Sequence, residues 1–174
     1  MVTALTGVTS DDVRAVLDTV PDPEMPPVSV AELGMVVDVR VNTDRVEVDL
    51  VPTYSGCPAT AVIREETARA VKAMEGVGSV EVRFVNTVVW EPERITAPGR
   101  RKLAEFGIAP PGSGQTLLQI GRRPGLGADG MGEGVVCPLC GSHDTVADSP
   151  FGPTPCRSSS YCNACRNPFE VIRP

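Results

Sequence analysis

The chain has 174 residues, of which 41% are apolar and only 4% aromatic, and its formal net charge is −6. This length allows one or two domains, whose cores must consist mainly of aliphatic side chains. The acidic balance argues against broad binding to nucleic acid or to an anionic membrane, because both need a basic footprint. The sequence shows no leader pattern in its first residues and no apolar run of about 18 residues, so we expect a cytoplasmic protein without a membrane span.

The first expected element is a helix that starts at Thr9 or Ser10 and ends before Pro21. A capping hydroxyl and two aspartates in the first turn suit the positive N-terminal end of a helix. Its apolar face would consist of four residues at helical spacing: Val13, Val16, Leu17 and Val20.

Two strands are expected next, over 37–41 and 46–50, because apolar and charged residues alternate there around a turn at 42–45. A second helix over about 58–74 can begin with Pro58, and a third strand covers 80–84. The buried face of this helix would include Val62, Ile63, Ala70, Val71 and Met74. With a short helix over 100–106, the order α-β-β-α-β-α predicts an α+β domain whose small sheet is covered by helices.

Five of the six cysteines lie in the C-terminal 39 residues. Two C-x-x-C pairs, Cys137 with Cys140 and Cys162 with Cys165, have the spacing of a tetrahedral zinc site. A closed shell of four thiolates leaves no position for a substrate, so structural Zn²⁺ is the expected cofactor, with an iron centre or a redox dithiol as alternatives. Cys156 is an alternative ligand or a fifth, free thiol. His143 is either a ligand or a solvated loop residue, and we favour the latter.

Cys57 is separate from the other cysteines. If Pro58 opens the second helix, Cys57 occupies the cap, where unpaired N–H groups would favour a thiolate. Such a thiolate could bind a metal or a cluster or act as a nucleophile, whereas a buried, inert cysteine in a tight turn is the alternative. Asp22 and Glu24 form an acid pair after the first helix, which a solvated turn would also explain.

Two segments carry the resemblance to known families. The runs DPEMPPVSVAELGMVVDV and VPTYSGCPAT are similar to the small domain of SufT-type iron–sulfur cluster assembly factors. The tail, with CPLCGS, SPFGPTPC and YCNACRNPFE, resembles the PaaD family of phenylacetate degradation, which is part of the phenylacetyl-CoA epoxidase system. The resemblance covers about 11–110 and 136–170. Relatives tend to carry an aromatic residue shortly after the Trp-x-Pro segment, where this chain has Glu93, Arg94 and Ile95.

The resemblance implies an accessory factor, not catalytic alone, that helps to mature a metal centre of the epoxidase system. The expected partners are the oxygenase subunit and the iron–sulfur flavin reductase subunit, and the reductase cluster is the favoured client; a homodimer is left open. By analogy, Cys57 would handle transient iron or an iron–sulfur cluster, with Asp22 and Glu24 lining the same region. Two alternatives are a zinc-containing docking subunit and a general iron–sulfur assembly factor.

The expected domain organisation has three parts. Residues 9–109 form the SufT-like assembly domain and residues 136–174 the four-cysteine, zinc-ribbon-like module. A Gly/Pro-rich linker over 110–135 joins them, because its composition is typical of a flexible connection.

Overall fold

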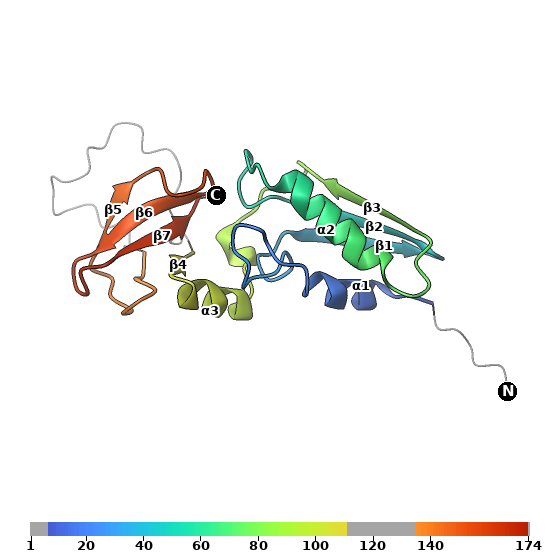
Figure 1. The fold of residues 1–174 in the computed structure, drawn as a ribbon, viewed down its shortest axis with the longest axis horizontal. Helices are drawn as coiled ribbons and strands as arrows, with labels where there is room; N and C mark the ends of the chain where they lie inside the picture. Colours follow the sequence, from blue (N-terminus) through green and yellow to red (C-terminus); the bar gives the residue numbers. More distant parts are fainter. Residues whose placement is uncertain (1–6, 111–134, 174) are drawn as a thin grey trace. The chain divides into compact units, whose positions relative to one another are not determined.

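The computed structural model describes residues 7–110 and 135–173. The linker expected over 110–135 therefore lies almost entirely outside the described residues. The chain divides into two compact units, Met1–Gly99 and Arg100–Pro174. The first unit contains both helices and strands, whereas the second consists mostly of strands (Figure 1). None of the described helices is long and apolar enough to cross a membrane.

The first unit contains a three-stranded sheet with two helices on one face (Figure 1). Strands β1 (Val36–Asn42) and β2 (Arg45–Leu50) are antiparallel, and β2 is parallel to β3 (Ser79–Phe84). Helix α2 (Thr60–Lys72) makes the crossover between the two parallel strands and packs on β3, while α1 (Ser10–Leu17) packs on α2 and β1. A 3₁₀ turn, η1 (Pro92–Arg94), follows. The predicted α+β fold is confirmed.

The N-terminal helix begins as its sequence predicts. Thr9 is the N-cap, and its hydroxyl accepts a hydrogen bond from the Asp12 backbone N–H. The Asp12 carboxylate in turn accepts from the Thr9 backbone N–H, which completes a capping box. Of the expected apolar face, Val13, Leu17 and Val20 are buried.

The start of α2 differs from the expectation. Its N-cap is Ala59, because the first helical bond joins the Ile63 N–H to the Ala59 carbonyl. Pro58 therefore belongs to the preceding turn, and Cys57 lies two residues before the cap and not at it. The buried face also differs, since Val62 is exposed and Thr67 is buried in its place.

The second unit contains a four-stranded sheet in the order β4-β7-β6-β5. Helix α3 (Ala97–Glu105) leads into β4 (Ile108–Ala109), which pairs in parallel with β7 (Pro168–Ile172). Strand β6 (Arg157–Cys162) is antiparallel to both β7 and β5 (Thr145–Ser149). The expected limits of 9–109 and 136–174 stay a prediction, but strand pairing places Ile108–Ala109 in the sheet of the second unit.

The exposed face of the first sheet carries a network of ion pairs. The Arg40 guanidinium contacts Glu47 at 3.1 Å and Asp49 at 2.9 Å on the neighbouring strand. Arg83 reaches Asp49 from the other side at 3.0 Å. For Asp49, burial alone would raise the pKa, but the hydrogen bonds from Arg40 and Arg83 outweigh it, so the pKa is lowered. The pKa of Glu47 is also lowered, mainly by its hydrogen bond from Arg40.

This network predicts that acid destabilises the first unit. A carboxylate whose folded pKa is lowered stabilises the fold above its unfolded pKa, and this contribution is lost as the pH falls through the folded value. We expect the urea midpoint of wild type, followed by Trp90 fluorescence, to drop as the pH falls below the ordinary carboxyl pKa of about 4. In Asp49→Asn the drop should be smaller, with a lower midpoint at pH 7. Equal acid sensitivity of both proteins would contradict a role for this network.

Candidate functional site

The four zinc-type cysteines lie on two turns with the same backbone geometry. In the first turn the Gly141 N–H bonds to the Cys137 carbonyl, and in the second the Arg166 N–H bonds to the Cys162 carbonyl, both at 2.9 Å. Gly141 and Arg166 both have a positive φ, of 74° and 58°. The N–H groups of Cys137 and Cys162 each bond to the carbonyl five residues later, at 2.9 and 3.0 Å. The two C-x-x-C segments are therefore equivalent knuckles.

The two knuckles bring their thiols together. The Sγ atoms of Cys137 and Cys165 are 3.8 Å apart, and those of Cys140 and Cys162 are 3.6 Å apart. All four Sγ atoms lie within 4.8 Å of one another. A tetrahedron with Zn–S bonds of about 2.3 Å has S–S edges of about 3.8 Å, so the four thiolates fit a zinc ion.

A second set of contacts joins the knuckles behind the thiols. The Asn163 side-chain amide donates to the Asp144 carboxylate at 2.8 Å, and the Asn163 backbone N–H donates to the Asp144 carbonyl at 2.9 Å. The core beneath is small and includes Cys137 and Cys162 themselves; its other buried members are Ala109, Val135, Phe169 and Val171.

The protein environment shifts the pKa values of two of the thiols in opposite directions. The side-chain amide of Asn167 donates to Cys165, and this bond is the main reason that the pKa of Cys165 is lowered to about 7. Around Cys140, the Ser142 N–H favours the thiolate, but burial and the three neighbouring thiols outweigh it and raise the pKa to about 12. A metal ion that binds all four sulfurs must therefore displace a proton from Cys140, so affinity rises with pH.

The other C-terminal candidates lie outside this group. Cys156 directly precedes β6 and Cys162 is its last residue, and six residues of strand span roughly 20 Å. The buried Cys156 thiol instead contacts the Thr154 hydroxyl at 3.1 Å. His143 is exposed in the turn before β5 and is not among the grouped ligands. Of the cysteines in this tail, the structure thus brings together the four of the two pairs and leaves Cys156 apart.

Cys57 lies in the loop between β2 and α2, at the end of the first sheet. Its N–H bonds to the Tyr54 carbonyl at 3.0 Å, and its own carbonyl accepts from the Thr60 hydroxyl at 3.3 Å. The loop is anchored to the sheet, because the Val51 N–H bonds to the Met35 carbonyl at 2.8 Å. Cys57 is half-buried, and these hydrogen bonds hold its backbone in place.

Asp22 and Glu24 occupy a turn after α1. The Asp22 carboxylate is buried and accepts the N–H groups of Glu24 at 2.8 Å and Met25 at 3.1 Å. Within the part of the chain that the structure describes, the four-cysteine cluster is the only group of three or more His, Cys, Asp or Glu residues with ligand atoms close enough to hold an ion. Cys57, Asp22 and Glu24 do not form such a group, and their shared role stays a prediction.

Sequence reasoning missed the structural role of the segment after Trp90. The Trp90 indole donates to the Leu33 carbonyl at 2.8 Å, and Arg94 donates to the carbonyls of Gly34 at 2.7 Å and Val36 at 3.0 Å. These partners are about 60 residues apart in the chain, and their acceptors are backbone atoms, so no residue pattern marks them.

Comparison with known proteins covers both units. Residues 10–82 match the family described as iron–sulfur cluster assembly protein, and residues 122–173 match the PaaD zinc beta ribbon domain. The chain is 31% identical over 162 residues to a protein of Escherichia coli (strain K12) described as a subunit of 1,2-phenylacetyl-CoA epoxidase, covering 93% of this chain and 91% of that protein. The chain belongs to the PaaD family. The family resemblance inferred from the sequence is thereby confirmed.

Two other relatives match about half of this PaaD-family chain. It is 35% identical over 97 residues to an iron–sulfur cluster carrier protein of Synechocystis sp. (strain ATCC 27184 / PCC 6803 / Kazusa), covering 56% of this chain and 26% of that protein. The crystal structure of a DUF59 domain from Bacillus anthracis matches with a TM-score of 0.51 and 26% identity, over 54% of this chain and 90% of that chain.

Proposed function

We propose that this PaaD-family chain is an accessory factor that helps to assemble an iron–sulfur or iron centre in a partner subunit of a phenylacetyl-CoA epoxidase. The observation that carries this proposal is the contrast among its six cysteines. Four thiols are committed to one cluster, and Cys156 is buried. Cys57 is the remaining cysteine, and it is half-buried on an anchored loop within the segment that matches iron–sulfur assembly proteins.

The chemistry expected of Cys57 is ligand exchange. An iron–sulfur cluster is commonly held by four thiolates, and Cys57 offers one. The remaining ligands would come from the client or from a second copy of the chain. In transfer, one bond between iron and Cys57 Sγ breaks as a bond to a client thiolate forms, and the client's thiol proton is released. This exchange changes no oxidation state, and a single protein ligand favours release of the cargo.

The acidic pair has a different proposed role. The Asp22 carboxylate already accepts two backbone N–H groups, so we assign it to shaping its own turn rather than to binding iron. Glu24 lies next to it on that turn. Both residues would then affect metal handling only through the position of the turn.

The four-cysteine cluster is proposed to hold a structural zinc ion. The two knuckles together supply all four ligands of one tetrahedral site, and this closed shell leaves no open position for a substrate. The favoured client is the iron–sulfur flavin reductase subunit, as the family resemblance implies. A general assembly factor would instead serve many clients, and a deletion phenotype confined to growth on phenylacetate would exclude that alternative.

One observation favours a docking subunit as the second candidate. Five large apolar side chains of the second unit are between 46% and 76% exposed: Phe106, Val136, Leu139, Val146 and Phe151. Where exposed apolar side chains form one contiguous patch, they mark a protein contact surface. In this alternative the zinc unit binds the oxygenase complex and Cys57 is a packing residue.

Replacement of Cys57 separates the two candidates. We expect Cys57→Ser to lower the iron and cluster content of the co-expressed reductase by at least about tenfold, since losing even an outer partner of a metal site costs that much. Cys156→Ala is the matched control, because it removes a thiol that is buried and outside the cluster. Iron and sulfide would be measured in the purified reductase, and association by size-exclusion chromatography.

Either outcome of this comparison is informative. Normal loading with Cys57→Ser would refute the maturation role as stated. If such a variant also stays bound to the oxygenase at fixed stoichiometry, the docking subunit is the better description. Loss of loading in both variants would point to misfolding and not to metal handling.

A further inference from the structure

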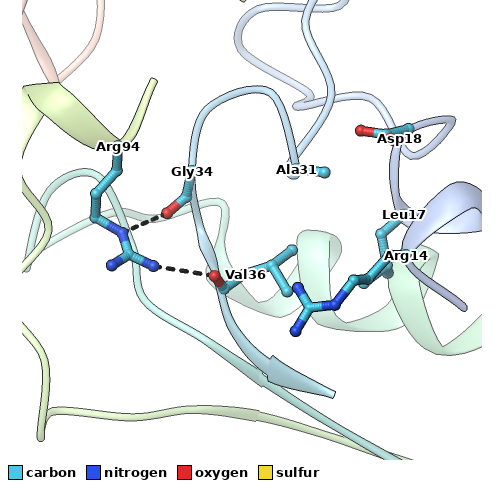
Figure 2. A pocket seen from close by; sticks show the side chains of 7 residues that line it. All are labelled: Arg14, Leu17, Asp18, Ala31, Gly34, Val36 and Arg94. Atoms are coloured by element: carbon cyan, nitrogen blue, oxygen red, sulfur yellow. Dashed lines mark hydrogen bonds between the residues drawn. The ribbon is translucent and has the colours of Figure 1, made fainter. Parts of the chain in front are cut away.

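A pocket of about 410 Å³ opens on the first unit, no cysteine lines it, and no part of the proposed function uses it. It lies between α1, the segment that leads into β1 and the 3₁₀ turn η1 (Figure 2). Apolar side chains from Leu17, Ala31 and Val36 form part of its wall. Two guanidinium groups, of Arg14 and Arg94, lie on either side of Val36 (Figure 2).

The Arg94 guanidinium is held in place by backbone acceptors. Its Nε–H donates to the Gly34 carbonyl at 2.7 Å and its Nη2 donates to the Val36 carbonyl at 3.0 Å. These bonds use two of its five N–H groups. The group is thus oriented before any ligand binds, and the rest of its donors have no acceptor among the described residues.

The second guanidinium comes from the exposed side of α1. The Arg14 guanidinium makes no hydrogen bond or ion pair with another residue in 7–110 or 135–173. Asp18 lies one turn later and also lines the pocket, but no ion pair forms between the two side chains. In a chain with net charge −6, two such guanidiniums around one cavity mark a local site of positive charge.

We propose that this pocket binds a carboxylate attached to a small apolar group. The planar guanidinium presents paired donors that match the two oxygens of a carboxylate. The walls formed by Leu17, Ala31 and Val36 would bury the apolar group. The Asp18 carboxylate in the lining disfavours a dianion such as phosphate, because it adds like charge. The carboxylate could belong to a free organic acid or to the C-terminus of a polypeptide.

The test is a titration of the full-length, zinc-loaded protein followed by NMR of the arginine Nε–H signals. The probes are sodium acetate, 3-methylbutanoate and N-acetyl-leucine, with N-acetyl-leucine amide and inorganic phosphate for comparison, all at constant ionic strength. We expect 3-methylbutanoate to shift the Arg94 signal saturably and to bind more tightly than acetate. N-acetyl-leucine binding more tightly still would identify a chain end as the source, and the reverse order a free acid.

Two variants test the role of the guanidinium. Arg14→Gln should weaken 3-methylbutanoate binding by about tenfold, the loss expected for one charge-assisted hydrogen bond. Arg64→Gln is the matched control, since Arg64 is also exposed on a helix but does not line the pocket, and it should leave binding unchanged. Both substitutions lie on exposed helix positions, so both variants are expected to fold.

Three results would overturn the proposal. The first is a shift that grows linearly without saturation. The second is equal binding of the amide or of phosphate, which would show that the carboxylate is not recognised. The third is an equal loss of affinity in Arg14→Gln and Arg64→Gln, which would reduce the effect to net charge.

Discussion

Removal of zinc is expected to unfold the second unit while the first unit stays folded. The apolar core around the knuckles is small and includes two of the ligands themselves. Metal binding to sites of this kind supplies about 10–16 kcal/mol, which is more than such a core can replace. The same result is expected for Cys162→Ser, because Cys162 is fully buried and ends the central strand β6.

The single tryptophan makes this prediction easy to check. Trp90 belongs to the first unit, so its fluorescence should be unchanged when a chelator removes zinc. Circular dichroism would report the loss of strands β5, β6 and β7, and elemental analysis the zinc content. In the control Cys156→Ala, zinc should remain at about one ion per chain, as expected for a single four-thiolate site. A zinc-free protein with unchanged strand signal would show that the knuckles do not depend on the metal.

Gly34→Ala is expected to be the most disruptive small substitution in the first unit. Gly34 has φ +70°, and an added Cβ would overlap the Arg94 carbonyl group, whose carbon would be only 2.5 Å away. The left-handed backbone costs a non-glycine residue about 1–2 kcal/mol, and overpacking against a backbone atom adds about 1–3 kcal/mol. Urea unfolding followed by Trp90 fluorescence should therefore show a loss of about 3 kcal/mol, near the middle of the summed range.

Gly76→Ala is the matched control for this effect. Gly76 has φ +89°, but an added Cβ would meet only the end of the Val8 side chain, at 3.3 Å. Its loss should stay near the cost of the backbone alone, about 1–2 kcal/mol. Equal losses in the two variants would mean that the close approach of Gly34 to Arg94 does not constrain the fold.

Local sequence patterns were sufficient for much of the first unit. The strands β1, β2 and β3 were predicted from alternation, because a half-buried sheet needs apolar residues on one face only. The capping of α1 was predicted from neighbouring residues for a similar reason, since all the bonds of a capping box are local. The first turn of α2 was not predicted correctly, because whether Pro58 starts a helix or ends a turn depends on the loop that carries Cys57.

The candidate site was likewise predictable from the sequence only in part. Spacing alone identified Cys137, Cys140, Cys162 and Cys165, since each C-x-x-C pair forms its own knuckle. Only the tertiary structure separated Cys156 from them, because the position of a thiol along β6 depends on strand pairing. The pairing of β4 with β7 and the pocket around Arg94 also required the structure. Both join residues far apart in the chain through hydrogen bonds to backbone carbonyls, and such acceptors leave no pattern in the sequence.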